Sequence, residues 1–397
     1  MKARWTSASA LARLAAVLLL GLWGAGAGAQ AQAPDEAAVL NVLKDLREQT
    51  QFIGVTVTDL YGKQQTRQIP VMIFRPTGDG PFPLVIMNHG RATPEKRSAQ
   101  GRQRYEWLSR YLVGKGFAVL LPTRVGYADT YGDFDPEDTG TCQSRRPGPM
   151  AAAVADQVMA TLAFAKTLPY VDTSRWLVMG QSAGGLTAVA TVSRHPPGLV
   201  GAINFSGGSG GDPDGRPRNP CSPQQIESLW KDQARSATAP MLWLYWENDL
   251  YWGPDVPRRW HEAWTAGGGK AEFHTLAAAG QNGHGALNFD MDHWVPYAEA
   301  FLAKLGFDAP GVIARPPASS FAAVDEVDKV PVPAATREGH YRKFLASKLP
   351  RAYAVGPKGA AGTASGDWAI GRALGFCQRK GEPCRLYAVD DDVVWTP

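Results

Sequence analysis

The sequence has no excess of charge of either sign, few cysteines and no long internal repeat. Its 397 residues include 41 basic and 37 acidic side chains, and their apolar content is sufficient for one large core or two smaller ones. Three of the cations lie in a segment that we expect to be removed, which leaves a formal charge of +1: Lys2, Arg4 and Arg13. A nearly neutral protein gives no electrostatic reason to bind nucleic acid or an anionic membrane.

The four cysteines are too few and too far apart for a metal centre. None forms a CxxC pair or lies in a His-rich segment, so no zinc site and no other metal is expected. An even number in an exported chain favours disulfides, although four cysteines permit three pairings. The four are Cys142, Cys221, Cys377 and Cys384.

The N-terminal segment has the form of a secretory signal. Basic residues precede an apolar stretch, Leu14–Trp23, and the small residues of Ala25–Ala33 provide Ala-x-Ala cleavage sites. An uncleaved membrane anchor is the alternative, but the apolar stretch is too short to span a bilayer comfortably. Residues 1–33 are therefore predicted to be a signal peptide, and the mature protein to be periplasmic or secreted, with no stable membrane span.

Alternating strand and helix patterns occupy residues 34–306. A short helix over 36–50 precedes a predicted hairpin of strands over 52–58 and 67–75. Apolar runs typical of buried strands follow at 83–88, 117–122, 175–180, 199–205, 241–246 and 271–276. Helical patterns lie between them or follow them, at 100–114, 150–167, 182–194, 256–266 and 292–305. This order predicts an α/β domain with a mostly parallel sheet covered by helices on both faces.

Two long loops follow strands of this sheet. The loops, 124–149 and 206–239, each carry one cysteine, Cys142 and Cys221, and we expect a disulfide between them at the rim of a pocket. The first loop contains five acidic residues but lacks the glycine and terminal glutamate of an EF-hand, so a solvated loop is predicted rather than a calcium site. These residues are Asp129, Asp133, Asp135, Glu137 and Asp138.

The C-terminal part of the chain has a different composition. Residues 307–335 are rich in Pro, Ala and Ser and are predicted to be a linker. Residues 336–397 then suggest a small α+β module, with helices over 341–349 and 367–378 and strands over 351–355 and 385–389. A module of this size has a marginal core, so a Cys377–Cys384 disulfide is expected to stabilise it.

The stretch Arg175–Ala190, RWLVMGQSAGGLTAVA, places a serine between a strand and a helix. Gly180 and Gly184 bracket Ser182 in a G-x-S-x-G pattern, and their missing side chains permit a sharp turn that presents the hydroxyl above the sheet edge. The helix N-terminus that follows favours developing negative charge. Ser182 is therefore the predicted nucleophile.

A serine of this kind requires a base and an acid. Of the seven histidines, His284 lies in a glycine-rich loop directly after the last strand, at the same sheet edge as Ser182. Asp249 follows the strand over 241–246, and Glu247 is the alternative acid two residues earlier. The order Ser182, Asp249, His284 is the one that this architecture uses.

The oxyanion of a tetrahedral intermediate requires two backbone donors. The N–H of Ala183, directly after the nucleophile, is one candidate. The loop after the strand over 83–88 continues as His89-Gly90-Arg91, where Gly90 permits a close approach and the Arg91 N–H is the second candidate.

Four segments together resemble the dienelactone hydrolase-like serine hydrolases of the α/β-hydrolase superfamily: VIMNHGR, VMGQSAGG, WENDLYWGP and NGHGA. The resemblance covers roughly residues 51–306, and it implies ester hydrolysis without a cofactor or metal. In one respect the sequence departs from the family, because the dienelactone hydrolases proper use a cysteine nucleophile where this chain has Ser182.

The expected activity is thus hydrolysis of small-molecule carboxylic esters through an acyl-enzyme. Arg124, Tyr251 and Trp252 lie beside the predicted site and are candidate substrate-binding residues, although most of the surrounding tryptophans are expected to pack in the core. One alternative is a peptidase or amidase that uses the same triad. The other is a non-catalytic binding protein whose C-terminal module contacts an unknown partner or the cell envelope.

Overall fold

The computed structural model describes residues 46–308, 316–366 and 369–396. The predicted signal peptide of residues 1–33 lies outside this part of the chain, as do residues 36–45 of the first predicted helix. The end of that helix was assigned wrongly, because Gln49 and Thr50 already belong to the first strand.

Eight strands within the described residues form one mixed sheet in the order β1-β2-β4-β3-β5-β6-β7-β8. β1 and β2 pair antiparallel, as the hairpin pattern predicts, and β2 pairs antiparallel with β4, whereas the remaining pairs are parallel. The strand bounds are β1 Gln49–Thr58, β2 Gln64–Phe74, β3 Phe82–Asn88, β4 Ala118–Pro122, β5 Val171–Gln181, β6 Leu199–Phe205, β7 Met241–Trp246 and β8 Ala271–Leu276.

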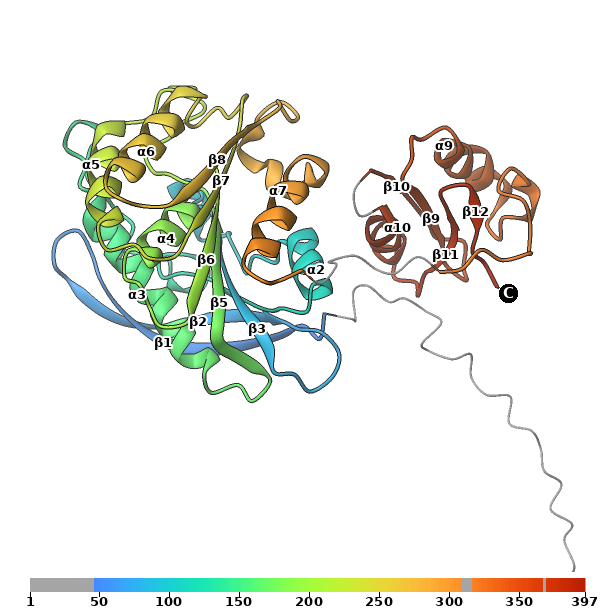
Figure 1. The fold of residues 1–397 in the computed structure, drawn as a ribbon, viewed down its shortest axis with the longest axis horizontal. Coiled ribbons are helices and arrows are strands. Elements are labelled where there is room, and N and C mark those ends of the chain that lie inside the picture. The colour runs from blue at the N-terminus through green and yellow to red at the C-terminus, as the bar shows by residue number, and fades with distance from the viewer. Residues whose placement is uncertain (1–45, 309–315, 367–368, 397) are drawn as a thin grey trace, which may run out of the picture. The chain divides into compact units, whose positions relative to one another are not determined.

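Helices cover both faces of the sheet (Figure 1). Their bounds are α1 Pro94–Arg97, α2 Glu106–Gly114, α3 Pro147–Ala165, α4 Ala183–Val192, α5 Pro223–Ala234, α6 Asp255–Ala266 and α7 Met291–Lys304. Short 3-10 helices lie at Ala128–Thr130, Cys142–Ser144 and Gly283–Asn288. The sequence pattern missed α5, which lies within the loop predicted over 206–239.

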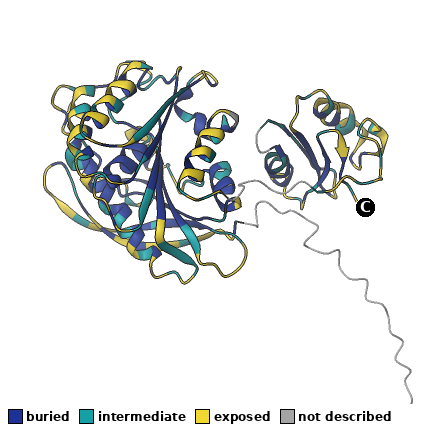
Figure 2. Cartoon of the chain, in the orientation of Figure 1, coloured by how far each residue is buried: buried dark blue, intermediate teal, exposed yellow. Residues whose placement is uncertain are grey.

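Strand periodicity divides the buried side chains between two cores. In β3, Ile86 belongs to the core that also contains side chains of α3, α4, α5 and α6, whereas Val85 and Met87 belong to the core on the opposite face, with side chains of α2 and α7. Burial on both faces explains why these strands are continuously apolar (Figure 2). The predicted α/β-hydrolase fold is confirmed.

The helix α3 is the one described helix that is long and apolar enough to cross a membrane. More than half of its most apolar stretch is buried inside the protein. Its buried residues, among them Val154 and Val158, belong to the core on the first face of the sheet. Its apolarity therefore follows from its place in the core.

The C-terminal module contains its own antiparallel sheet, ordered β10-β9-β11-β12. Its strands are β9 Arg351–Val355, β10 Ala361–Ser365, β11 Arg385–Val389 and β12 Asp392–Val393, and its helical segments are Ala334–Thr336, Arg337–Tyr341, α9 Arg342–Leu345 and α10 Ala369–Gln378. The helix α10 covers one face of the sheet, where Ala352 and Ala354 are buried. The sequence pattern predicted β9, β11 and α10 but not β10 and β12.

The segment predicted as a linker contributes to the core of this module. Val330 and Val332 are buried with Tyr341 and Tyr353 on the second face of the small sheet, and the Ser319 amide donates to the Val393 carbonyl. Another short 3-10 helix lies at Val327–Lys329. Residues of the predicted linker therefore cover the second face of the small sheet.

Both expected disulfides are present. Cys142 pairs with Cys221 across a sequence separation of 79 residues, and Cys377 pairs with Cys384 across 7. The first bond joins two loops of the large sheet, and the second closes the short segment between α10 and β11.

We predict that the two disulfides differ in their effect on stability. A disulfide that closes a long loop restricts the unfolded chain more, so Cys142→Ser with Cys221→Ser should lower the free energy of unfolding by roughly 2–4 kcal/mol. The double variant Cys377→Ser with Cys384→Ser should lower the free energy of unfolding by a clearly smaller amount. Calorimetric unfolding of both double variants beside the wild type checks this, and equal losses would contradict it.

Candidate active site

The turn at Ser182 has the strained backbone of a nucleophile presented between a strand and a helix. Ser182 lies between β5 and α4 with φ 59° and ψ −122°, a conformation that L-residues rarely adopt. Its amide donates to the Phe205 carbonyl at 2.9 Å, and its carbonyl accepts from the Leu186 amide at 3.1 Å. Packing of β5, β6 and α4 therefore holds the strained residue in place.

The two bracketing glycines create the space for this turn. A Cβ on Gly180 would overlap the backbone of Gly184, and a Cβ on Gly184 would overlap the carbonyl of Asn88 at the end of β3. Any side chain at either position would push α4 away from the sheet. The G-x-S-x-G pattern therefore reflects a steric requirement of the turn.

His284 and Asp249 lie together in the loops that follow β8 and β7. The distance between His284 Nδ1 and Asp249 Oδ2 is 2.9 Å, and Asp249 is fully buried. Its other oxygen accepts from the amides of Tyr251 at 2.7 Å and Trp252 at 3.3 Å. Glu247, the alternative acid, is exposed. Of the two candidate acids, Asp249 is therefore the one that contacts His284.

The hydrogen bond to Asp249 determines which ring nitrogen of His284 can act as a base. An ionised carboxylate only accepts hydrogen bonds, so the neutral imidazole carries its proton on Nδ1. Nε2 is then left with a lone pair, and it has no hydrogen-bond partner among the described residues. His284 and Ser182 line the same cavity.

Tyr251 and Trp252 enclose the His284 ring, but only Tyr251 reaches the cavity. The Tyr251 ring stacks on the imidazole, with centroids 3.8 Å apart and planes 19° apart. Trp252 meets the imidazole edge-on at 5.5 Å, is buried, and donates its indole N–H to the Ser206 carbonyl. The expectation that Trp252 binds substrate is therefore wrong, because its ring belongs to the core.

A cavity of about 240 Å³ lies between the candidate residues. Its walls come from the loop after β3, the segment before α2, the Ser182 turn and the loops that carry Asp249 and His284. The lining is largely polar and includes Arg91, Gln100, Tyr105, Gln181 and Tyr251.

Of the two predicted oxyanion donors, Arg91 lines this cavity, and Ala183 directly follows Ser182, which also lines it. Within the described part of the chain, the N–H groups of Ala183 and Arg91 have no hydrogen-bond acceptor. Gly90 is not a third donor, because its amide donates to Tyr105 Oη at 3.2 Å. Its contribution is steric, since a Cβ there would lie 2.9 Å from Gln181 Oε1 and 3.3 Å from Ser182 Cβ.

Arg124 is part of a buried ionic cluster and does not line the cavity. Its Nε donates to Glu137 Oε1 at 2.5 Å, and its Nη1 donates to the His89 carbonyl at 2.6 Å. Tyr127 Oη donates to the other oxygen of Glu137 at 2.6 Å. The expectation that Arg124 binds substrate is therefore wrong, because its guanidinium is fully buried.

The same cluster neutralises the charge of Arg91. The Arg91 guanidinium forms a bidentate pair with Asp135, at 2.7 and 3.1 Å, and lies 3.4 Å from Glu137. Arg97 pairs with Asp135 as well, at 2.7 Å. The loop predicted to be solvated thus places two of its acids, Asp135 and Glu137, in ion pairs beneath the site.

We predict that Glu137→Gln destabilises the protein in a pH-dependent way. Burial alone would raise the Glu137 pKa, but the Arg124 and Arg91 guanidiniums outweigh it and lower the pKa from 4.5 to about 2. Loss of the carboxylate leaves a buried guanidinium without its counter-ion, which costs roughly 3–5 kcal/mol. Urea unfolding of both proteins measures this loss at neutral pH.

The pH dependence has a definite sign. Because the pKa is lower in the folded state, the carboxylate stabilises the fold fully above about pH 4.5, and this stability is lost as the pH falls towards 2. The gap between wild type and Glu137→Gln should therefore shrink below pH 4.5. A constant gap between pH 7 and pH 3 would contradict the assignment.

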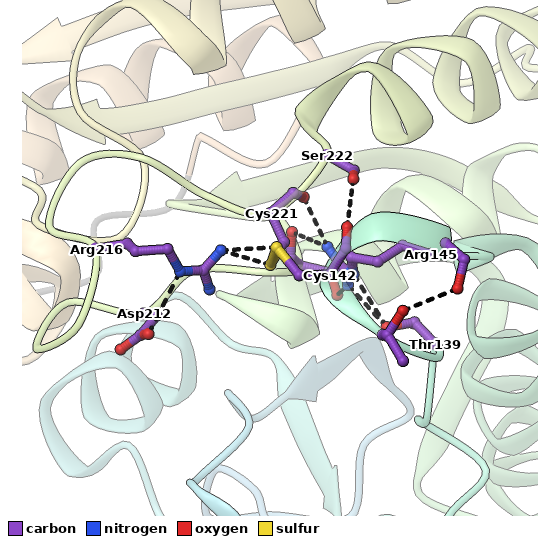
Figure 3. Close-up of a disulfide and its surroundings, with 10 residues drawn as sticks. Thr139, Cys142, Arg145, Asp212, Arg216, Cys221 and Ser222 are labelled. Carbon is purple, nitrogen blue, oxygen red and sulfur yellow. Dashed lines mark hydrogen bonds and ion pairs between the residues drawn. A yellow bond between two sulfur atoms is a disulfide. The ribbon is translucent and has the colours of Figure 1, made fainter.

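A strap across the two long loops supports the wall of the site (Figure 3). Besides the Cys142–Cys221 disulfide, the buried Arg145 donates to Thr139 Oγ1 and to the carbonyls of Ser209 and Cys221. Burial lowers the Arg145 pKa to about 10, with a contribution from nearby Arg91 and Arg216.

The strap is continuous in sequence with Gly211, which lies against the Tyr251 ring that stacks on His284. The Ser209 carbonyl accepts from Arg145, and the Gly210 carbonyl accepts from the Cys221 amide. Gly211 follows, and a Cβ there would lie 2.6 Å from Cδ1 of Tyr251. On the outer side, Arg216 contacts both sulfur atoms of the disulfide and lies 3.5 Å from Asp212 (Figure 3). The segment that the strap holds thus packs against the Tyr251 ring that stacks on the imidazole.

Four polar side chains that line the cavity were not found from the sequence: Gln100, Gln103, Tyr105 and Gln181. Tyr105 Oη donates to Gln181 Oε1 at 3.1 Å, and Gln181 Nε2 donates to the His284 carbonyl at 2.8 Å. Gln100 contacts the loop after β3. Gln181 is a variable position of the G-x-S-x-G pattern. The others lie in the first part of the helix predicted over 100–114, which is irregular because α2 begins only at Glu106, so neither periodicity nor spacing marks them as site residues. No group of three or more potential metal ligands lies together in the described residues.

Comparison with known proteins gives a family and a set of similar folds. A model of the dienelactone hydrolase family matches residues 70–300. No curated protein matches the chain. A proposed dienelactone hydrolase of Klebsiella pneumoniae is 19% identical, with 65% of this chain and 99% of that chain covered and a TM-score of 0.44.

Two further solved structures have similar scores. An esterase of Thermogutta terrifontis is 17% identical, with coverage of 62% and 92% and a TM-score of 0.43. An acylaminoacyl peptidase of Pyrococcus horikoshii is 14% identical, with a TM-score of 0.45; the match covers 66% of this chain but only 43% of the peptidase. The family match spans more than half of the chain and contains the segments that carry Ser182, Asp249 and His284. The chain therefore belongs to the dienelactone hydrolase family and is a hydrolase with the α/β-hydrolase fold.

Proposed function

We propose that the protein is an exported serine hydrolase that cleaves carboxylic esters through Ser182, His284 and Asp249. One observation carries the proposal: a serine in a strained strand-to-helix turn shares a cavity with a histidine whose Nε2 is unpaired and whose Nδ1 is held by a buried aspartate. This is the arrangement that turns a weakly nucleophilic hydroxyl into an effective one.

The reaction follows from these positions. Ser182 Oγ attacks the ester carbonyl carbon while His284 Nε2 accepts the hydroxyl proton, and the oxyanion forms beside the amides of Ala183 and Arg91. Collapse of the intermediate breaks the bond to the leaving oxygen, which receives the proton from His284. Water, deprotonated by the same histidine, then attacks the acyl-enzyme and releases the acid and free Ser182. Asp249 stabilises the imidazolium at each stage.

The cavity favours a small, uncharged acyl group. Its volume of about 240 Å³ lies below the roughly 300–1,000 Å³ typical of pockets for drug-sized ligands. Arg91 is already paired with Asp135, and Arg124 is buried with Glu137, so neither cation is available to a substrate carboxylate.

Export is proposed on two grounds. The first 33 residues have the composition of a signal peptide. Both disulfides would persist in an oxidising compartment such as the periplasm or the extracellular medium.

We predict that Ser182→Ala abolishes ester hydrolysis without unfolding the protein, because the variant lacks only the attacking oxygen. Labelling with a fluorophosphonate probe, followed by peptide mapping, should place the adduct of the wild type on Ser182 and show none in the variant. Ser193→Ala, just beyond the other end of α4, is the matched control and should label normally. Full activity of purified Ser182→Ala would refute the proposal.

We also predict a preference for short acyl chains. The rate constant kcat/KM for p-nitrophenyl acetate should exceed that for the palmitate ester at least tenfold, because a long chain cannot enter the cavity. A matched anilide, measured in the same assay, separates esterase from amidase activity. Faster cleavage of the anilide would assign the site to amides.

A further inference from the structure

His89 lies in the loop after β3, two residues before Arg91. Its contacts determine which ring nitrogen carries the proton. Its Nε2 lies 3.1 Å from the Arg124 amide, a group that can only donate. Nε2 is therefore the acceptor, and Nδ1 carries the proton of the neutral ring. Burial, with a contribution from Arg124, lowers the His89 pKa to about 3, so the ring is neutral at physiological pH.

The protonated nitrogen of His89 holds the Gly90 carbonyl. Nδ1 lies 2.7 Å from the Gly90 oxygen, and with its proton assigned it donates to that oxygen. Gln100 donates a second hydrogen bond to the same oxygen, from Nε2 at 3.1 Å. The carbonyl thus has two donors on the side away from the amide of the same peptide group.

Gln100 also holds the next peptide group along the chain. Its Oε1 accepts from the Ala92 amide at 2.9 Å, which fixes the orientation of the side-chain amide and leaves Nε2 to face Gly90. One side chain therefore bonds the peptide groups on both sides of Arg91 and restricts both of its backbone dihedrals.

The direction of the Arg91 N–H follows from the planarity of the peptide bond. In a trans peptide the carbonyl oxygen and the N–H point in opposite directions. With the Gly90 oxygen held by His89 and Gln100, the Arg91 N–H must face the other way. That N–H has no acceptor among the described residues, and Arg91 lines the cavity beside Ser182.

We infer that Gln100, together with His89, positions the Arg91 N–H as an oxyanion donor by clamping the Gly90–Arg91 peptide group. Gln100 is thus a positioning residue that acts through a backbone amide, and this role rests on the proposed serine hydrolase activity. Without the clamp the peptide group can rotate, and the N–H must then be reoriented during the reaction. Much of its stabilisation of the transition state is lost as a result.

The test is the variant Gln100→Met, which keeps the length of the side chain but removes both hydrogen bonds. Loss of an oxyanion donor typically costs roughly a hundred- to thousandfold in rate. A donor that is present but not clamped should cost about 10- to 100-fold in kcat for p-nitrophenyl acetate, with KM changed less than twofold, because the oxyanion exists only beyond the ground state. The rate of fluorophosphonate labelling should fall by a similar factor.

Two further variants make the result specific. Gln100→Glu can still accept from the Ala92 amide but cannot donate to the Gly90 oxygen when ionised, so it should lose as much kcat as Gln100→Met. Gln224→Met, the same chemical change at an exposed position in the first turn of α5, should retain the wild-type kcat. Thermal unfolding of all three establishes that each is folded.

The outcomes separate this inference from the proposed function. Wild-type kcat and labelling rate in Gln100→Met, or a raised KM with kcat unchanged, would overturn the clamp while leaving the serine hydrolase intact. Full kcat in Gln100→Glu would show that the bond to Gly90 is unnecessary and would overturn it as well. A wild type that is neither labelled nor active would remove both proposals.

Discussion

The buried ion pair between Arg124 and Glu137 is the interaction on which the site depends. From one fully enclosed position, Arg124 holds Glu137 through its guanidinium, the His89 carbonyl through Nη1 and the His89 ring through its backbone amide. Burial of two charges is costly unless they are paired and hydrogen-bonded. Both members of the pair belong to the long loop after β4, and the bonds of Arg124 to His89 connect this loop to the one after β3. The cost of desolvating the pair is therefore linked to the geometry of the candidate oxyanion site.

A second network crosses the site through neutral groups. The Gly90 amide donates to Tyr105, Tyr105 donates to Gln181, and Gln181 donates to the carbonyl of His284. This network connects the loop after β3, the Ser182 turn after β5 and the loop after β8 that carries His284. Parallel strands place their carboxyl ends at one edge of the sheet, so the three loops already lie close together. Three side-chain hydrogen bonds are then sufficient to fix these loops relative to one another.

The charges of three arginines near the cavity are paired with acidic side chains. Arg91, Arg97 and Arg124 all lie near the cavity. Each forms an ion pair with Asp135 or Glu137, and both of these acids belong to the long loop after β4. The polar lining that remains consists largely of amides, phenols and backbone groups. Such a lining supports the proposal of a neutral rather than an anionic ester, and Tyr251 stacks on the imidazole beside it.

The sequence by itself determined the fold class, the strands β3 to β8, the turn at Ser182 and the order of the three candidate catalytic residues, because these depend on local periodicity, glycine sterics and the chain direction of a parallel sheet. Only the tertiary structure decided which polar residues face the cavity. Arg124 and Trp252 lie next to the site in sequence but point into the core. Gln100, Tyr105 and Gln181 reach the site from positions that no periodicity or motif marks as polar site residues. Pairing of charges and orientation of peptide groups arise from contacts between distant loops, and neither leaves a periodic trace in the sequence.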